Sequence, residues 1–327
     1  MKKYASLILF AFLLNGCDDG DLTVDEINFE SVTSSQACDT ETNALIYKLK
    51  DQEALLLQMP EGSIINDNED YDYTIDSKGN GQYRVVYRAY DGKVATTNIC
   101  GTIPPSTPRV TQEWLGKDGI IHIESRQIDK QNTNDDGTRI TGYSHSIIFR
   151  NITFAKPSGD QIEAKYTFGT YQTTVTPADF TFRTNPEGTG IIYQCDNYKR
   201  VYNYNNSFYL SIEDIDPTLF ENVDTPANQP RTRLISSTAN KIYYRTAKAE
   251  TGSFSQEYIC TPTATPAVDQ TWTGQLGKTG ESGIIEVTTT HAAQIYTHTI
   301  VLKNVILEKG NSSFKLGSNF VLGSVIK

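Results

Sequence analysis

Two nine-residue segments decide the fold of this chain, because one is a close copy of the other. Residues 143–151 read YSHSIIFRN and residues 296–304 read YTHTIVLKN, at a constant offset of 153 positions. Alternate residues from Tyr143 to Phe149 share one face of an extended chain, which is the two-residue period of a β-strand. A strand that recurs at this distance predicts an internal duplication.

Four further matches follow in the same order in both halves of the chain. They are a Tyr-Arg pair, a Pro/Thr-rich stretch after a cysteine, a lone tryptophan and a Gly-Ile-Ile triplet: 87–88 and 244–245, 101–105 and 261–266, Trp114 and Trp272, 119–121 and 283–285. Chance similarity between strands does not give five matches in one order. The sequence therefore predicts two homologous β-rich domains, residues 36–183 and 190–327, each of ordinary domain size.

Strand signals account for most of each repeat. Two hairpins are expected around dipeptides that tolerate a positive φ, Asp91-Gly92 between strands 83–90 and 93–100, and Asn205-Asn206 between strands 201–204 and 207–211. Beyond the N-terminal apolar run no window of a dozen residues keeps a 3.6-residue period, and one short helical turn is expected near 217–220. We predict an all-β protein with two tandem β-sandwich or small β-barrel domains.

The chain has five cysteines, so disulfide pairing leaves one cysteine over. In an exported protein the extra cysteine is accounted for when it carries a modification. Cys38, Cys100, Cys195 and Cys260 allow three pairings, and the duplication makes Cys38 equivalent to Cys195 and Cys100 to Cys260. One disulfide inside each repeat, Cys38–Cys100 and Cys195–Cys260, follows. Closing each loop of about 60 residues stabilises the fold by on the order of 4 kcal/mol in the chain-entropy model. Metal ligation is the alternative, but no pair has C-x-x-C spacing.

The N-terminus has the form of an export signal. Lys2 and Lys3 precede an apolar run from Ala5 to Leu14, which is too short to span a bilayer. The next residues, Leu-Asn-Gly-Cys at 14–17, resemble the lipobox of bacterial lipoproteins. That resemblance implies cleavage after residue 16 and lipid on Cys17, and two or three acyl chains hold a protein stably at a membrane. A plain secretory peptide is the alternative.

An acidic cluster, Asp18-Asp19-Gly20-Asp21, opens a polar tether expected over residues 17–35. Together with the lipobox and the repeats, it makes the chain similar to tandem β-domain outer-membrane lipoproteins of Bacteroidota. The resemblance implies a lipid-anchored protein of the outer membrane at the cell surface, with the membrane as its partner through Cys17. In other Gram-negative bacteria an Asp after the lipidated Cys resembles an inner-membrane retention signal instead.

The charge excludes one class of partner. The formal net charge is −10 and becomes −12 once Lys2 and Lys3 are removed with the signal peptide. A field of this sign repels polyanions, so we expect no nucleic-acid binding.

The histidines and one acidic loop are the metal candidates. His145 and His298 occupy equivalent places, but each is the single shared imidazole of its repeat, so a structural role is favoured over a metal ligand. Residues 132–137 (NTNDDG) place oxygen side chains before a glycine as calcium loops do, yet the twelfth place is Tyr143 rather than Glu. A polar hairpin loop is the favoured interpretation, and we expect neither metal nor cofactor.

Catalytic signatures are missing from the sequence. It has no G-x-S-x-G, no H-E-x-x-H, no phosphate loop and no dinucleotide fingerprint. Paired carboxylates for glycoside cleavage need no motif and stay open among the 39 Asp and Glu residues. We expect no enzyme activity and assign no catalytic residue.

The tyrosines offer the remaining functional signal. Tyr202 and Tyr204 share a strand face, and Tyr71, Tyr73, Tyr193 and Tyr198 lie among polar residues. An exposed stacking platform is one interpretation, and packing inside the sheets is the favoured one. The leading functional hypothesis is a non-catalytic binding or structural module. The alternatives are a glycan-binding accessory lipoprotein and a secreted glycosidase or other hydrolase.

Overall fold

The computed structural model describes residues 26–132, 136–195 and 199–327, which form two compact units. Unit 1 holds the described residues up to 65 together with 70–125 and 144–173, and unit 2 holds 66–69, 126–143 and 174–327. The all-β class is confirmed, and the sheets do not close into barrels, as sandwich domains require. The signal peptide and Cys17 lie outside the described residues.

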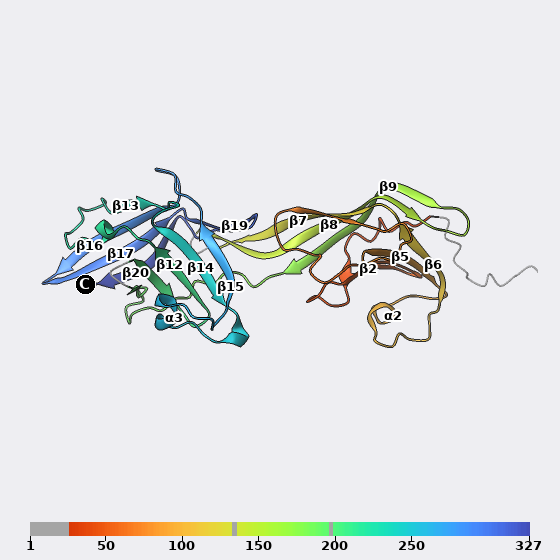
Figure 1. Ribbon diagram of the computed structural model, residues 1–327, viewed down its shortest axis with the longest axis horizontal. Helices are drawn as coiled ribbons and strands as arrows, with labels where there is room; N and C mark the ends of the chain where they lie inside the picture. The colour runs from red at the N-terminus through yellow and green to blue at the C-terminus, as the bar shows by residue number, and fades with distance from the viewer. Residues whose placement is uncertain (1–25, 133–135, 196–198) are drawn as a thin grey trace, which may run out of the picture. The chain divides into compact units, whose positions relative to one another are not determined.

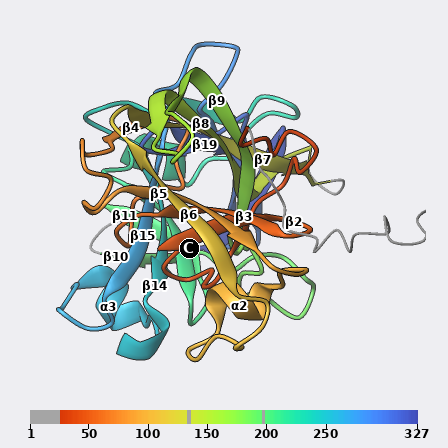
Figure 2. The same ribbon diagram turned by 90° about the vertical axis from the view of Figure 1, so that its right-hand side faces the viewer.

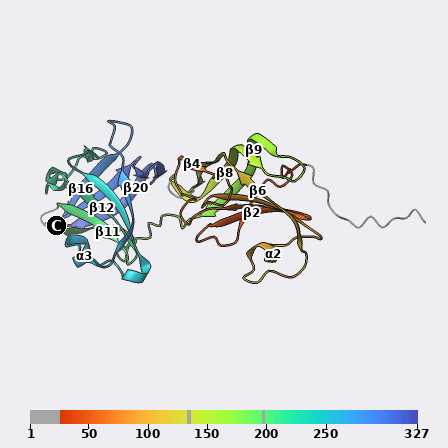
Figure 3. The same ribbon diagram turned by 45° about the vertical axis from the view of Figure 1, so that its right-hand side comes forward.

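Unit 1 is a two-layered arrangement of one folded-over sheet. The hydrogen-bonded order is β1-β2-β3-β5-β6-β8-β7-β4, with β9 paired to β8. The layer of β2 and the layer of β8 and β9 enclose a core of large apolar side chains such as Leu55 and Phe149 (Figure 3). The strands are β1 (Gln36–Ala37), β2 (Leu45–Lys50), β3 (Glu53–Gln58), β4 (Asp70–Thr74), β5 (Arg84–Tyr90), β6 (Val110–Lys117), β7 (Ile120–Gln131), β8 (Thr138–Phe154) and β9 (Gln161–Thr174).

Unit 2 repeats this arrangement as two sheets, in the orders β10-β11-β12-β14-β15-β18-β19 and β13-β16-β17-β20 (Figure 1). Apolar residues such as Leu210 and Leu302 fill the space between them. The strands are β10 (Tyr193–Cys195), β11 (Arg200–Tyr204), β12 (Phe208–Glu213), β13 (Arg231–Leu234), β14 (Lys241–Ala247), β15 (Val268–Gly274), β16 (Ile284–Ala292), β17 (Ile295–Lys303), β18 (Ile306–Lys309), β19 (Ser312–Lys315) and β20 (Asn319–Ile326).

The two halves share strand order and register. The run β1-β2-β3-β5-β6 corresponds to β10-β11-β12-β14-β15, and β4 pairs with β7 as β13 pairs with β16. Tyr87 lies opposite Trp114 across one strand pair, and Tyr244 lies opposite Trp272 across the equivalent pair. The matched sequence segments therefore occupy matching places in the fold.

The expected strand over 93–100 is wrong. Asp91-Gly92 forms a turn after β5, but the chain continues into a short helix, α2 (Thr96–Cys100). The Asp91 carboxylate accepts a hydrogen bond from the Arg109 amide (2.7 Å), and the Asn98 side chain accepts one from the Ala95 amide (2.9 Å). The Asn98 bond is a local side-chain-to-backbone contact of the kind that competes with strand pairing, whereas the Asp91 bond joins residues 18 positions apart. The expected hairpin at 205–206 joins β11 to β12, and the expected turn is the 3-10 helix Pro217–Phe220.

Each repeat has one disulfide, Cys38–Cys100 in unit 1 and Cys195–Cys260 in unit 2. Cys38 directly follows β1 and is linked to α2, and Cys195 ends β10 and is linked to α3 (Gln256–Cys260). Figure 2 shows α2 on the side of the β2, β3 and β6 layer that faces away from β9. The disulfides thus hold the helices over the outer faces of their sheets, where smaller apolar clusters are buried.

The tether is shorter than the predicted 17–35. Ile27 and Phe29 are buried in the core of unit 1, because two apolar residues spaced two apart lie on one side of an extended chain. Ser34 forms a parallel bridge with Thr170 of β9, and Ile191 forms the equivalent bridge with Ser324 of β20. Each unit therefore begins with a leading segment that packs beside its last long strand.

A buried donor holds each leading segment in place. In unit 1 the Lys48 ammonium donates to the carbonyls of Phe29 (3.0 Å) and Phe168 (2.6 Å). In unit 2 the amide of Asn203 donates to the carbonyls of Arg183 and Leu322, both at 3.2 Å. Lys48 and Asn203 occupy matching strand positions. Lys48 lies opposite Leu55, which lies opposite Tyr87 on the next strand. In the same way, Asn203 lies opposite Leu210, which lies opposite Tyr244. In both units a buried side-chain donor thus binds a backbone carbonyl of the leading segment and one of the last long strand, although the side chain differs.

The hairpin of β7 and β8 is longer than its counterpart, and its outer part belongs to unit 2. β7 has 12 residues and β8 has 17, whereas β16 and β17 have 9 each. Ile140 and Tyr143 lie in the core of unit 2, although the sequence assigns them to repeat 1. The predicted boundary between 183 and 190 therefore separates the repeats but not the compact units.

Within the described residues, no helix has the length and apolar character needed to cross a membrane.

Candidate ligand pocket

Unit 2 has a pocket of about 520 Å³ whose floor is aromatic. Its rings include Phe208 from β12, Tyr244 from β14, Trp272 from β15 and Phe314 from β19, all of which are at least nine-tenths buried. Segment 175–179, which follows β9, forms part of the wall. A concave apolar site of this size falls in the range of roughly 300–1,000 Å³ that small-molecule sites occupy.

The pocket is lined by a Tyr-Trp pair of unit 2 whose equivalent pair in unit 1 is stacked ring on ring. In unit 1 the rings of Tyr87 and Trp114 stack with their centroids 4.7 Å apart. The Tyr87 hydroxyl donates to a carboxylate oxygen of Glu53, at 2.9 Å. The duplicated tyrosine and tryptophan of unit 1 therefore satisfy each other and a third side chain.

In unit 2 the same two residue types contact other rings. Tyr244 packs on Phe180 at 4.9 Å between centroids, and Trp272 packs edge-on against Phe314 at 5.0 Å. Phe208 occupies the position that Glu53 has in unit 1. Glu53 lies two residues before Leu55, the strand partner of Tyr87, and Phe208 lies two residues before Leu210, the strand partner of Tyr244. Both Tyr244 and Trp272 line the pocket as a result.

The Tyr244 hydroxyl helps to shape the wall. It donates to the backbone carbonyl of Asp179 at 3.1 Å. Burial raises the pKa of the Tyr244 hydroxyl above its ordinary value, and the nearby Asp179 carboxylate acts in the same direction. The phenol therefore stays protonated and fixes segment 175–179 as a neutral donor.

Polar groups surround the aromatic floor. The Gln270 side-chain oxygen accepts from the Trp272 indole at 3.1 Å and from the Lys309 ammonium at 3.4 Å. The Thr246 hydroxyl accepts from the Gln270 backbone amide at 3.2 Å. The exposed carboxylate of Asp269 also lines the opening. The rim thus combines an amide, a hydroxyl, the carboxylates of Asp179 and Asp269 and one ammonium group.

Eight lining residues come from the sequence of repeat 1, namely Asn66, Ile140, Tyr143 and the five residues of segment 175–179. Tyr143 donates its buried hydroxyl to the Ser312 hydroxyl at 2.9 Å. The turn after β18 is held from the same side, because the Asp67 carboxylate accepts from the Asn311 backbone amide at 2.9 Å. The pocket is therefore built from residues of both repeats within one compact unit.

The tyrosine platform considered from the sequence is not formed by Tyr202 and Tyr204. Both are buried next to α3, so the packing interpretation is confirmed for them. Tyr193 stacks on Tyr202 at 5.8 Å, and Tyr73 stacks on Tyr83 at 4.7 Å. Tyr71 is half-buried, and Tyr198 lies outside the described residues.

The two equivalent histidines are buried and hydrogen-bonded to hydroxyl groups. Nδ1 of His145 lies 2.9 Å from the Ser125 hydroxyl, and Nδ1 of His298 lies 2.8 Å from the Thr289 hydroxyl, on the neighbouring strand in each case. Burial lowers the pKa of each imidazole to about 4, with help at His298 from nearby cationic groups. The favoured structural role agrees with these contacts.

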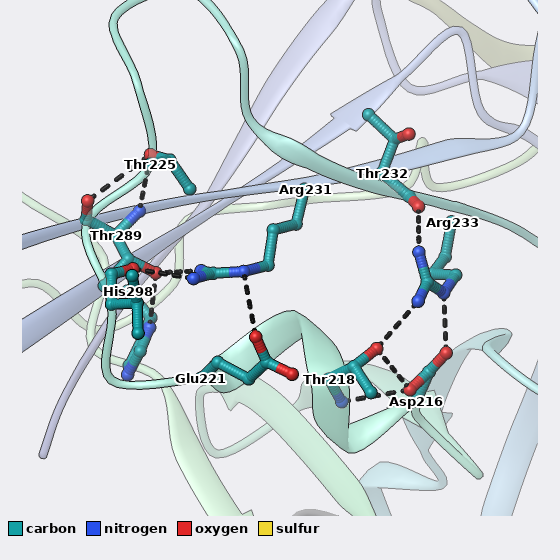
Figure 4. A network of polar contacts seen from close by, with 10 residues as sticks. Asp216, Thr218, Glu221, Thr225, Arg231, Thr232, Arg233, Thr289 and His298 are labelled. Carbon is teal, nitrogen blue, oxygen red and sulfur yellow. Dashed lines mark hydrogen bonds and ion pairs between the residues drawn. The ribbon is translucent and has the colours of Figure 1, made fainter.

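Around His298 the polar contacts continue along β13 (Figure 4). Arg231 donates to the Thr289 hydroxyl at 2.8 Å, which places the cation close to the imidazole. Across the described part of the chain no three His, Cys, Asp or Glu side chains are grouped so that they could hold a metal ion.

The hairpin interpretation of residues 132–137 agrees with the described ends of that loop. The Asn132 amide donates to the Gly137 carbonyl at 2.8 Å, between β7 and β8. Residues 133–135 of the proposed calcium loop lie outside the described residues.

The sequence shows Trp272 and Tyr244 as duplicated positions but does not show that they line a pocket. The signal that could have pointed to it is a loss of symmetry, since Glu53 in one repeat corresponds to Phe208 in the other.

Comparisons with protein-family models, with curated proteins and with solved structures found no match to this chain.

Proposed function

We propose that this protein is a non-catalytic binding module whose ligand site is the pocket of unit 2. The observation that carries the proposal is the divergence of one duplicated pair. Tyr87 and Trp114 stack on each other, whereas Tyr244 and Trp272 both line an open pocket. A copy that keeps both rings but directs them at a cavity supports binding in unit 2 and a scaffolding role for unit 1.

The proposed address is the outer membrane, at the cell surface, with lipid on Cys17. Its support is the lipobox-like Leu14–Cys17, the signal core before it and the acidic residues after it. Mass spectrometry of the N-terminal peptide from membrane-extracted protein tests this address. A first residue Cys17 with diacylglyceryl mass is expected, and an unmodified cysteine would contradict the anchor.

Ligand-observed NMR of the full-length protein with a library of small ring compounds tests the binding function. Ser207 is exposed at the pocket and is replaced by Phe to fill it. Compounds that bind the wild type are expected to lose contact with Ser207→Phe. The matched control is Gln52→Phe in unit 1, because Gln52 and Ser207 accept the same backbone bond, from Tyr90 and Ala247. Equal loss in both variants, or no binding compound at all, argues against the proposal.

Hydrolysis is the second candidate, because two carboxylates, Asp179 and Asp269, line one pocket. The Asp179 carboxylate already accepts from the Thr181 amide (2.9 Å) and hydroxyl (2.6 Å), which ties it to its own loop. Turnover of aryl glycosides that disappears in both Asp179→Asn and Asp269→Asn would favour this candidate. No turnover by the wild type supports the non-catalytic proposal.

A further inference from the structure

We infer that the unit 2 pocket takes an uncharged saccharide, an inference that rests on the proposed binding function. Tyr244, Trp272 and Phe314 offer flat apolar surfaces, and the ring of a sugar has an apolar face of C–H groups that matches them. A ligand without such a face would leave the aromatic floor without a partner.

Cationic ligands are disfavoured because the protein already supplies cations to these rings. The Lys309 ammonium lies 5.5 Å from the centroid of the Trp272 ring. The Arg139 guanidinium lies 4.6 Å from the ring centroid of Phe180 and 6.0 Å from that of Phe314. All three distances are within the range of cation–π attraction. A ligand cation would therefore compete with two fixed positive charges.

Anionic ligands are disfavoured by the carboxylates of the rim. Asp179 and Asp269 both line the opening, whereas Lys309 is the one cationic residue among the lining side chains. Like charges at short range raise the cost of binding, even where solvent screens them. A neutral ligand therefore meets no like charge in the pocket, whereas a cation or an anion does.

The rim supplies the groups that hydroxyls require. The Gln270 side chain uses its oxygen for Trp272 and Lys309, and its Nε2 group has no partner among the described residues. The Asp269 carboxylate likewise makes no hydrogen bond or ion pair within the described chain. A hydroxyl can accept from the first and donate to the second, which matches a polyol.

Tryptophan fluorescence provides a local readout, because the chain has two tryptophans and Trp114→Phe leaves Trp272 alone. The full-length Trp114→Phe protein is titrated with neutral sugars (glucose, galactose, mannose, N-acetylglucosamine and their disaccharides), an acidic sugar (glucuronic acid) and an amino sugar (glucosamine). A saturable change in emission is expected with at least one neutral sugar and with neither charged sugar. Calorimetry on the wild type repeats the measurement without relying on the substitution.

Two rim variants test whether the sugar contacts the proposed groups. Gln270→Ala and Asp269→Ala are each expected to weaken binding by about tenfold, as loss of a hydrogen bond to a polar or charged group does. Their matched controls are the corresponding residues of unit 1, Gln112→Ala and Thr111→Ala, which are expected to bind as the parent does. Weakening by the controls to the same degree would overturn the assignment.

The remaining outcomes separate this inference from the proposed function. Tighter binding of glucuronic acid or glucosamine than of any neutral sugar overturns the inference and leaves unit 2 a binding module. If no sugar binds, but library compounds bind the wild type and not Ser207→Phe, the inference is again overturned and unit 2 is still a binding module. If neither sugars nor library compounds bind, both the inference and the proposed function fail.

Discussion

Gly169 and Gly323 occupy the same place in the two units, in the last long strand beside the leading segment. Their φ angles are +126° and +143°, which favour glycine. A Cβ at Gly169 would lie 2.7 Å from the Thr33 carbonyl oxygen, and one at Gly323 would lie 2.3 Å from that of Gly190. Backbone atoms cannot move aside, so the close approach of the leading segment requires glycine here.

Gly323→Ala is therefore expected to lower the free energy of unfolding of unit 2 by about 2 kcal/mol or more. Gly280→Ala is the control, because Gly280 also has a positive φ (+74°) but open space around it. Chemical denaturation followed by Trp272 fluorescence in the Trp114→Phe background compares the two. Equal losses would show that the φ angle alone, and not the contact with Gly190, requires glycine.

The buried histidines make stability depend on pH. Their pKa values are about 4 in the folded protein, below the ordinary 6.5, so the unfolded chain binds more protons between these limits. Stability is therefore expected to fall as pH decreases from about 6.5 towards 4, by up to roughly 3 kcal/mol per histidine. His298→Gln should flatten this dependence, and adding His145→Gln should flatten it further. An unchanged slope in the double variant would contradict the prediction.

Among the elements, the β7–β8 hairpin has the largest consequence for the site. Its outer part contributes Ile140 and Tyr143 to the core of unit 2, and both residues line the pocket. Hydrogen bonds hold it to β19, including one from the Lys315 amide to the Thr138 hydroxyl at 2.9 Å. Repeat 2 has a short hairpin at the equivalent place, so this extension is specific to the first copy.

Ile140→Ala is expected to lower the stability of unit 2 by about 2–4 kcal/mol, as loss of a buried Ile side chain does. Denaturation reported by Trp272 measures unit 2, and the reciprocal Trp272→Phe background reports unit 1 through Trp114. The midpoint of unit 1 is expected to stay in place. Ile162→Ala, at a position that is 72% exposed, is the control. It should change the free energy of unfolding of either unit by no more than about 0.5 kcal/mol.

The elements also show how far the sequence predicts the structure. Alternation in 143–151 and 296–304 predicted β8 and β17, and Asn205-Asn206 predicted the β11–β12 hairpin. The helices α2 and α3 have five residues each, which is too short for a 3.6-residue period to show in a sequence. Asn98 and Ser255 accept from nearby backbone amides, but such side chains are equally common in turns.

The pocket was not predictable from the sequence for a different reason. Its residues range from Asn66 to Phe314 and come together only in the folded unit. Trp114 and Trp272 are matched residues in matched strands, and what separates them is the identity of the rings packed around them. The identity of a pocket residue therefore depends on contacts that no local pattern encodes.

At the scale of the whole molecule, each unit has its own disulfide, and each disulfide closes a loop that holds four strands, β2 to β5 in unit 1 and β11 to β14 in unit 2. Replacing Cys195 and Cys260 by Ala removes a link across 65 residues and is expected to destabilise unit 2 by about 4 kcal/mol. The matched pair, Cys38→Ala with Cys100→Ala, removes a link across 62 residues in unit 1. Each double variant should lower the midpoint reported by the tryptophan of its own unit. A loss shared equally by both units would contradict independent stabilisation.

The partition of the hairpin has a consequence for how this protein would come apart. Residues 186–188 form an exposed turn between the repeats, where a protease would cut. Such a cut leaves residues 126–143 on the N-terminal fragment, although they belong to unit 2 and include Ile140 and Tyr143 of its core. The severed pieces would therefore remain together as a non-covalent pair, and would separate only when the C-terminal fragment gave up part of its own interior.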